Sequence, residues 1–283
     1  MLVAMWNRTL FVMLLACTAA SGQSRPHPPR SVRLYVFDDG MIRGINPEMF
    51  HFKKEEVAAA DMVVASYLIV HPKGTLMWDS GAIPDSEIKG DGSIATQGLY
   101  SASKTLRSQL AGIGYTPQDI TYFALSHYHG DHTANANDFA GATWLVQQPE
   151  RAAMFGDKAP PITQRARYDA LKDSKTKILK GEDYDVFGDG TVVIKAAYGH
   201  TPGHQVLYVK LARTGPVLLA GDLYHYQEER GTDKTPTFEF NRDQSLASRA
   251  AMEAFIKKTG AQFWIEHDVT NFNKLKKSPH YYD

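Results

Sequence analysis

The chain has 283 residues, enough to bury a large core, and its formal charge is zero because 31 basic residues balance 31 acidic ones. No basic run is longer than residues 274–277, so the charge pattern argues against a nucleic-acid partner. The single cysteine, Cys17, excludes a disulfide framework and a cysteine-based metal site in the body of the chain. One large α/β domain is at least as well supported as two small ones.

The N-terminus has the pattern of an export signal. Arg8 precedes the apolar run 10–16, and small residues follow through Gly22. The apolar run is too short for a comfortable membrane span. We therefore expect residues 1–22 to be a signal peptide and the mature protein to work outside the cytoplasm, in the periplasm or secreted.

An alternative for this segment stays open. Residues 14–17 resemble a bacterial lipoprotein box, which would lipidate Cys17 and tether the protein to a membrane. In either case we expect residues 23–31, which contain three prolines and a histidine, to be an extended linker. Residues 32–283 then form the folded domain.

Expected strands and helices alternate from residue 32 onward. A helix is predicted at residues 103–113, where apolar residues recur with a helical period before glycines, and another at residues 243–258. The polar region 151–177 is expected to contain a helix and a connection, and the turn 188–190 a hairpin. Strands are predicted at residues 32–37, 61–70, 75–79, 122–125, 142–146, 185–187, 191–196, 205–211, 216–220 and 262–265.

Four potential metal ligands, His127, His129, Asp131 and His132, lie within six residues after the expected strand 122–125. Imidazole and carboxylate groups suit zinc and similar divalent ions, and the absence of thiolates argues against a structural cysteine site. The first two histidines can converge on one ion while the other two ligands turn toward a second. A histidine-rich surface loop and a structural zinc site are the alternatives, but the strand-to-loop context favours two metals.

Three further ligand candidates, His200, Asp222 and His267, each follow an expected strand. Loops at one edge of a pair of sheets can bring such distant residues into one cleft. Two other residues are candidates for orienting the ligand histidines, since a ligating imidazole usually donates its second N–H to a partner. These are Asp79 and His204, although for His204 a satisfied core histidine is the favoured interpretation.

The order of these seven residues resembles the metallo-β-lactamase superfamily in its binuclear hydrolase form. The resemblance extends over residues 32–268 and implies a four-layer αββα sandwich, with two divalent metal ions, most often zinc, at the open edge of its two sheets. It assigns His127, His129 and His200 to one ion, Asp131, His132 and His267 to the other, and Asp222 to a bridge between them.

Within the superfamily, residues 34–38, 199–204 and 220–224 resemble N-acyl-homoserine lactonases, which open the lactone ring of bacterial quorum-sensing signals. The resemblance implies quorum quenching and a small acylated lactone as substrate. Many such lactonases place a tyrosine three residues after the bridging aspartate, where it contacts the substrate carbonyl, and this chain has His225 there. We expect His225 to be the hydrogen-bond donor, with a packing role as the alternative, and Tyr224 to contact substrate beside it.

The chemistry implied by this resemblance gives Asp222 and His225 catalytic roles. Asp222 would be both a metal ligand and the general acid that protonates the leaving alkoxide, and His225 would stabilise the carbonyl oxygen. The acyl chain needs an apolar groove beside the metals. Residues 41–50 and 236–240 could form its walls, although ordinary core packing is the alternative.

Other functions remain in competition. A β-lactamase is disfavoured by the bridging carboxylate, and a glutathione thioesterase by the expected export signal, whereas a phosphotriesterase needs much the same metal pair. A di-iron redox protein would typically have a glutamate in place of His129, and a non-catalytic metal-binding module would have a closed site. The preferred acyl length and the oligomeric state are left open.

Overall fold

The computed structural model describes residues 27–158, 160 and 162–283. The predicted signal segment 1–22, with Cys17, and the first part of the linker lie outside the described residues. Within the described part, no helix combines the length and the apolar character needed to cross a bilayer.

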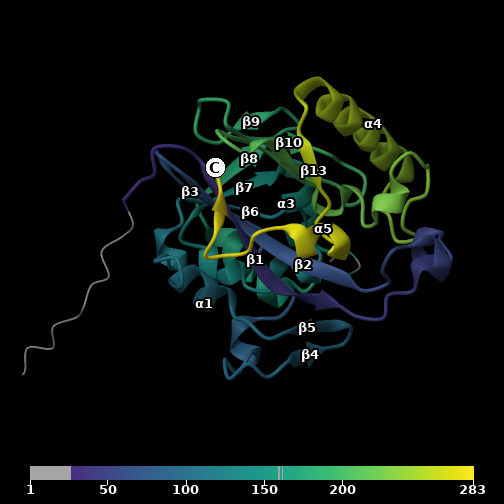
Figure 1. The fold of residues 1–283 in the computed structure, drawn as a ribbon, viewed down its shortest axis with the longest axis horizontal. Helices are drawn as coiled ribbons and strands as arrows, with labels where there is room; N and C mark the ends of the chain where they lie inside the picture. Colours follow the sequence, from purple (N-terminus) through teal and green to yellow (C-terminus); the bar gives the residue numbers. More distant parts are fainter. Residues whose placement is uncertain (1–26, 159, 161) are drawn as a thin grey trace, which may run out of the picture.

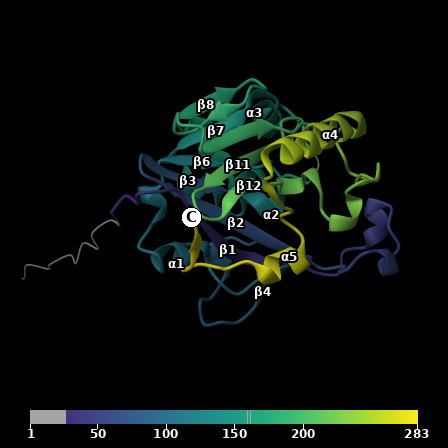
Figure 2. The same ribbon diagram turned by 45° about the horizontal axis from the view of Figure 1, so that its top comes forward.

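Nine strands form the first sheet, and β2, which is buried along its entire length, lies near its centre. The strands are β1 (Arg33–Ile42), β2 (Met62–His71), β3 (Gly74–Trp78), β4 (Ala95–Gln97), β5 (Tyr100–Ala102), β6 (Tyr122–Ala124), β7 (Thr143–Gln147), β8 (Thr176–Leu179) and β14 (Tyr281–Tyr282). Their order is β4-β5-β1-β2-β3-β6-β7-β8, and β14 pairs with β1. Figure 2 shows this C-terminal strand beside β1.

Five strands form the second sheet in the order β13-β12-β11-β10-β9. They are β9 (Tyr184–Asp185), β10 (Val192–Ala196), β11 (Gln205–Leu211), β12 (Gly215–Leu219) and β13 (Gln262–Trp264). β9 and β10 pair antiparallel, which confirms the predicted hairpin, and only β12 and β13 of the described pairs in this sheet are parallel.

The described part of the chain also has five α-helices: α1 (Leu106–Ala111), α2 (Gly130–Thr133), α3 (Gln148–Phe155), α4 (Arg242–Thr259) and α5 (Val269–Lys274). The long helix α4 has clear boundaries because Asn241 caps its first turn and Gly260, in a left-handed conformation at φ +67°, ends it. α1 is shorter than the predicted helix 103–113, since the side chain of Thr105 caps it two residues inside the expected start.

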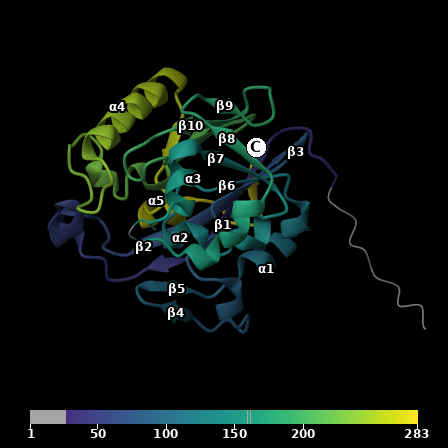
Figure 3. The ribbon, with the colours of Figure 1, turned by 180° about the vertical axis from the view of Figure 1, so that it is seen from behind.

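The sheets pack face to face around a large apolar core. This core includes Val36, Tyr67 and Trp78 from the first sheet and Leu207 and Leu219 from the second. A second apolar cluster joins the outer face of the first sheet to α1 and α3, and a third joins the second sheet to α4. In Figure 1, α4 and α1 lie on opposite sides of the two sheets, and Figure 3 shows α3 over the outer face of the first. The predicted αββα sandwich is confirmed.

The strongly patterned elements were predicted and several short ones were not. The prediction missed β4, β5, β8, β14, α2 and α5. β4 and β5 have only three residues each, with the sequences Ala-Thr-Gln and Tyr-Ser-Ala, so they carry too little apolar alternation to be recognised. Their pairing depends on the neighbouring strand β1.

Candidate metal centre

The first cluster of ligand candidates lies in the loop that follows β6. β6 is parallel to β3 and β7, so the carboxyl ends of three buried strands meet at this edge of the sheet. The loop passes directly into the single turn of α2, which carries Asp131 and His132. All four candidates are buried, His127 and His132 completely. Polar side chains therefore occupy a position where an ordinary core would be apolar.

The other three candidates arrive from the second sheet. His200 follows β10, Asp222 lies in a short 3-10 turn after β12, and His267 follows β13. The turn at Asp222 depends on Gly221, whose φ is +50° and whose position leaves no room for a side chain. A Cβ atom there would lie 2.8 Å from the Cβ of Ser126. Glycine thus allows the two ligand-bearing loops to approach closely.

Asp222 lies between two groups of histidines and turns one carboxylate oxygen toward each. Its Oδ2 is 3.6 Å from Nε2 of His127 and 3.4 Å from Nε2 of His200. Its Oδ1 is 3.2 Å from Nε2 of His132 and 3.1 Å from Nε2 of His267. This is the arrangement expected of a carboxylate that bridges two cations.

Two sets of residues could each hold a metal ion, because one ligand atom from every member lies within 4.8 Å of the others. His129 completes the first set, its Nδ1 being 3.1 Å from Nε2 of His200. Asp131 completes the second, with Oδ2 at 3.5 Å from Nε2 of both other members. The sets are His127, His129, His200 and Asp222, and Asp131, His132 and His267.

The donor atoms of this cluster fit divalent cations. Nε2 of His127, Nε2 of His132 and Oδ1 of Asp222 are buried and have no hydrogen-bond partner within the described part of the chain. Buried polar atoms without partners are rare in folded proteins. Imidazole nitrogens and carboxylate oxygens are the ligands that zinc and similar ions prefer, so bound cations would satisfy all of these atoms.

The charge states of three of these residues agree with cation binding. Burial lowers the pKa values of His127 and His129 well below the usual value, so both imidazoles are neutral. Burial opposes the ionisation of Asp222, but the surrounding histidines, His267 first, hold its pKa well below the usual range. Burial would also lower the pKa values of His132 and His200, but nearby carboxylates, Asp222 and Glu239 respectively, raise them. His127, His129 and Asp222 are thus in the deprotonated forms that bind metals.

Contacts at Nδ1, the ring nitrogen that does not face Asp222, fix the orientation of His200 and His267. Nδ1 of His267 is 2.8 Å from the carbonyl oxygen of Val63, and Nδ1 of His200 is 3.1 Å from a carboxylate oxygen of Glu239. Such partners orient the imidazole ring and set which nitrogen faces the metal. Glu239 was predicted only as part of a pocket wall, and no residue spacing in the sequence distinguishes its role.

Two buried carboxylates lie behind His132. Its Nδ1 is 3.3 Å from Oδ2 of Asp79, which confirms the prediction that Asp79 orients a ligand, and 3.4 Å from Oε1 of Glu266. Burial raises the pKa of Glu266 well above the usual value. The sequence analysis missed Glu266, although an acidic residue directly before the ligand candidate His267 was an available signal.

His204 is a satisfied core histidine, as favoured from the sequence. Its Nε2 accepts a hydrogen bond of 3.0 Å from the backbone N–H of Asp222, and its Nδ1 is 3.0 Å from the carbonyl oxygen of Ala197. Burial lowers its pKa to about 3, so the ring is neutral. His204 therefore positions the backbone of Asp222 rather than a ligand imidazole.

Glu150 joins the first two ligand-bearing loops. This buried carboxylate accepts hydrogen bonds from the backbone N–H of Tyr128 at 2.9 Å, the hydroxyl of Thr201 at 2.8 Å and the backbone N–H of Gly203 at 2.8 Å. Burial raises its pKa to about 7. The sequence analysis did not identify Glu150, because its partners are far away in the chain.

His225 faces the metal centre and Tyr224 does not. Nε2 of His225 lies 3.2 Å from Oδ2 of Asp222, and its backbone N–H donates to Glu229 at 3.2 Å. Burial alone would lower its pKa, but Asp222 and Glu229 raise it to about 10. Tyr224 lies instead in the cluster beneath α4, with its ring under the guanidinium of Arg249. This placement is at odds with the predicted substrate contact of Tyr224, because adjacent side chains of extended backbone point to opposite sides.

A mainly apolar pocket of about 520 Å³ opens onto the centre. The two segments predicted as its walls contribute Ile45, Met49 and Phe50 from one side and Phe238 from the other, so this prediction is confirmed. A third wall, residues 97–100 of the β4–β5 hairpin, was not predicted. Asp131, Asp222, His225 and His267 line the bottom of the same pocket.

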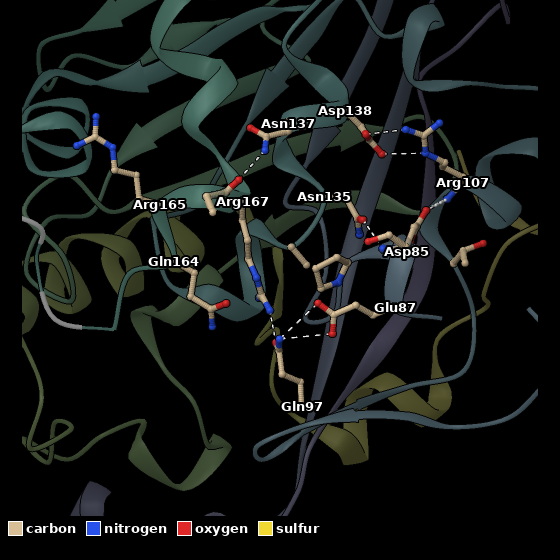
Figure 4. Close-up of a pocket in the computed structure, with 15 residues that line it drawn as sticks. Asp85, Glu87, Gln97, Arg107, Asn135, Asn137, Asp138, Gln164, Arg165 and Arg167 are labelled. Carbon is tan, nitrogen blue, oxygen red and sulfur yellow. Dashed lines mark hydrogen bonds and ion pairs between the residues drawn. The ribbon is translucent and has the colours of Figure 1, made fainter. Parts of the chain in front are cut away.

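A larger cavity of about 810 Å³ lies beyond Gln97, and Figure 4 shows its side chains. Its lining is polar and includes Arg107, Asp138 and Arg167, but none of the seven ligand candidates. Dashed lines in Figure 4 join most of its labelled charged groups to one another or to neighbouring polar groups. The apolar pocket, and not this larger cavity, is therefore the one associated with the centre.

Residues 60–258 match the family model of the metallo-beta-lactamase superfamily. The match covers more than half of the chain, and the sandwich and the placement of the ligand candidates agree with it. The protein belongs to the metallo-beta-lactamase superfamily.

The chain is similar over most of its length to proteins named as N-acyl homoserine lactonases. The chain is 28% identical over 267 residues to an N-acyl homoserine lactonase, AttM, of Azorhizobium caulinodans, covering 89% of this chain and 99% of the relative. It is 26% identical to the N-acyl homoserine lactonase AiiA of Bacillus thuringiensis subsp. kurstaki, covering 78% and 87%. The structure of an N-acyl homoserine lactone hydrolase with N-hexanoyl-L-homoserine at its catalytic metal centre aligns with a TM-score of 0.71 at 24% identity, covering 88% of this chain and 98% of the other.

Proposed function

We propose that this protein is a metal-dependent hydrolase that opens the lactone ring of N-acyl-homoserine lactones. Relatives that carry this name span nearly the whole chain. The observation that carries the proposal is the position of Asp222, with one oxygen toward each of two ligand sets at the bottom of an apolar pocket. A bridged pair of cations suits ester hydrolysis, and the pocket suits an acyl chain.

The seven ligand candidates are proposed to hold two zinc ions, because imidazole nitrogens and carboxylate oxygens are ligands that zinc prefers. When bound, such ions polarise an ester carbonyl and lower the pKa of a water molecule to about 7. The first ion would be held by His127, His129 and His200, the second by Asp131, His132 and His267, with Asp222 shared by both.

The remaining groups of the pocket act on the substrate directly. The apolar walls bind the acyl chain and exclude water from it. Nε2 of His225, on the side of Asp222 Oδ2, donates a hydrogen bond to the carbonyl oxygen as negative charge develops there. Glu229 holds His225 in place by accepting a hydrogen bond from the backbone N–H of His225.

Asp222 moves the proton. The oxygen of water forms a bond to the carbonyl carbon, and its proton passes to the carboxylate of Asp222. The ester C–O bond of the ring then breaks, and Asp222 returns the proton to the ring oxygen, which becomes the hydroxyl group of an N-acyl-homoserine. One carboxylate thus acts first as a base and then as an acid.

Acid release on ring opening tests this function. Purified protein loaded with zinc would be added to short-chain and long-chain homoserine lactones in weakly buffered solution, with a phosphotriester and a cephalosporin alongside. We expect rapid acid release from the lactones that a chelator abolishes. Inert lactones together with rapid cleavage of the phosphotriester would contradict the proposal and favour the phosphotriesterase alternative.

We also propose that the reaction takes place outside the cytoplasm. The support is the sequence pattern of residues 1–22, a charged start, an apolar run and small residues. The alternative is a protein that is also outside the cytoplasm but is attached to a membrane through a lipid on Cys17. Mass spectrometry of the mature protein distinguishes cleavage before a small residue near position 22 from a lipid-modified Cys17, and an intact N-terminus would contradict both.

A further inference from the structure

The β4–β5 hairpin forms a wall of the pocket that faces the second ligand set. β5 pairs with β1, with Tyr100 opposite Ile42, and this pairing directs Tyr100 to the same pocket as Asp131 and His267. Tyr100 is half-buried. It has no role in the reaction described so far, and the residues that match the superfamily pattern do not include it.

The Tyr100 side chain lines the pocket together with Asp131, Asp222 and His267. No hydrogen bond of its hydroxyl is found within the described part of the chain. A phenol group is a hydrogen-bond donor, so this hydroxyl is available to a substrate in the pocket.

Tyr100 and His225 lie toward different ligand sets. His225 is next to Oδ2 of Asp222, the oxygen that faces His127 and His200. Tyr100 lines the pocket with Asp131 and His267, two members of the other set. The pocket thus has a donor toward each end of the paired site. An ester also has two oxygens that gain negative charge during hydrolysis, the carbonyl oxygen first and the leaving oxygen later.

We propose that the hydroxyl of Tyr100 donates a hydrogen bond to the ring oxygen as the ester C–O bond breaks. This assignment rests on the proposed lactonase function and gives its two donors separate tasks. His225 serves the carbonyl oxygen and Tyr100 the leaving oxygen. The proton that the leaving oxygen finally takes still comes from Asp222, so Tyr100 keeps its own proton throughout.

The hairpin that carries Tyr100 is tied to the ligand loop. Arg167 donates a hydrogen bond of 2.6 Å to the carbonyl oxygen of Gly130, the residue before Asp131, and another to the side chain of Gln97 on β4. The amide of Gln97 in turn donates to Glu87, and Figure 4 shows both contacts of Gln97. One buried guanidinium thus fixes the position of the hairpin relative to Asp131. A donor held in this way needs little reorganisation during the reaction.

The substitution Tyr100→Phe tests the proposal, because it removes only the hydroxyl. Zinc-loaded wild-type and variant proteins would be compared on N-hexanoyl-homoserine lactone and on the matching homocysteine thiolactone. We expect kcat for the lactone to fall about a hundredfold with KM and metal content unchanged. The kcat for the thiolactone should fall far less, since a thiolate leaving group does not need strong stabilisation by a hydrogen bond. Tyr208→Phe is the control, because Tyr208 lies under α4 against Phe255 and should change neither rate.

Four results would overturn the assignment. An unchanged lactone rate in Tyr100→Phe would show that the hydroxyl does not act on the reaction. Equal losses for lactone and thiolactone, or a loss of bound zinc, would show a structural role. If the wild-type protein cleaves the thiolactone but no oxygen lactone, the proposed lactonase function fails, and with it the role of Tyr100.

Discussion

Two polar regions of this molecule lie side by side, and they differ in how their charged groups are satisfied. In the larger cavity, the guanidinium of Arg107 forms two hydrogen bonds with Asp138, at 2.9 and 2.6 Å. Asp85 accepts the backbone N–H groups of Leu106 and Arg107 at the start of α1. At the ligand cluster, in contrast, buried atoms of His127, His132 and Asp222 have no hydrogen-bond partner in the described structure.

The difference teaches that size does not identify the functional site. The larger cavity is a set of polar groups that satisfy one another and stabilise the fold near α1. The smaller pocket is lined by buried polar atoms that lack hydrogen-bond partners. Such atoms destabilise the folded protein unless a bound ligand interacts with them. The predictions below test this contrast.

The largest effect is expected from Asp222→Ala. Removal of the shared carboxylate should release one of two bound metals and reduce kcat/KM by more than the roughly hundredfold typical of losing an outer partner of a metal ligand. Elemental analysis and lactone kinetics measure both. Asp138→Ala, in the larger cavity, is the matched control, with full activity and a stability change of at most about 1 kcal/mol. Retention of both metals and full turnover in Asp222→Ala would contradict the bridge.

His225→Phe should have the next largest effect. Loss of one donor to a developing oxyanion typically lowers kcat by about a hundredfold or more. The ring should still fit between Phe50 and His267, whose rings lie against that of His225, so metal content should change little. Steady-state kinetics with zinc analysis separate the two effects. Unchanged kinetics would mean that the carbonyl donor lies elsewhere and that His225 has the packing role.

A smaller effect is expected from Glu239→Gln. The substitution keeps an oxygen near Nδ1 of His200 but removes the charge that supports this ligand. Affinity for zinc should fall about tenfold, at the lower end of the range for such partners. Competition with a chromophoric chelator measures it. Glu253→Gln, on α4 and paired with Arg230, is the control, and an equal loss there would exclude a specific role for Glu239.

The last prediction concerns the pH dependence of stability rather than activity, at a buried carboxylate outside both regions. Burial raises the pKa of Asp39 from 3.8 to about 7. Folding therefore favours its protonated form, and this contribution to stability is present below pH 3.8 and is lost as the pH rises through about 7. Asp39→Asn should remove this part of the pH dependence. The free energy of unfolding of the variant should therefore rise relative to that of the wild type by up to about 1.4 kcal/mol per pH unit between these two pH values. Urea unfolding at pH 5, 6 and 7 measures the difference, and parallel curves would contradict it.

The sequence predicted the ligand cluster well because local rules determine it. Four candidates lie within six residues, and the others directly follow strands of apolar residues, so the strand ends place them without knowledge of the sheet order. The same rules found both apolar pocket segments. Asp79 was found for a similar reason, as it follows β3 directly.

Contacts between distant segments could not be predicted in this way. Glu150 accepts hydrogen bonds from two other loops, and Glu239 reaches back to His200 from beyond β12. Tyr100 lies on a three-residue strand that forms only against β1. The opposite directions of Tyr224 and His225 depend on the turn that follows Asp222. Each of these features is decided by tertiary packing rather than by the residues nearby in sequence.

The most direct test of the metal centre is the number of ions bound per chain. Purified protein would be dialysed against zinc, freed of excess metal and measured by inductively coupled plasma mass spectrometry, with protein concentration from amino-acid analysis. The structure predicts two zinc ions per chain in the wild type and one in Asp222→Ala. One ion or none in the wild type would contradict the paired site, and with it the role of Asp222 as a bridge.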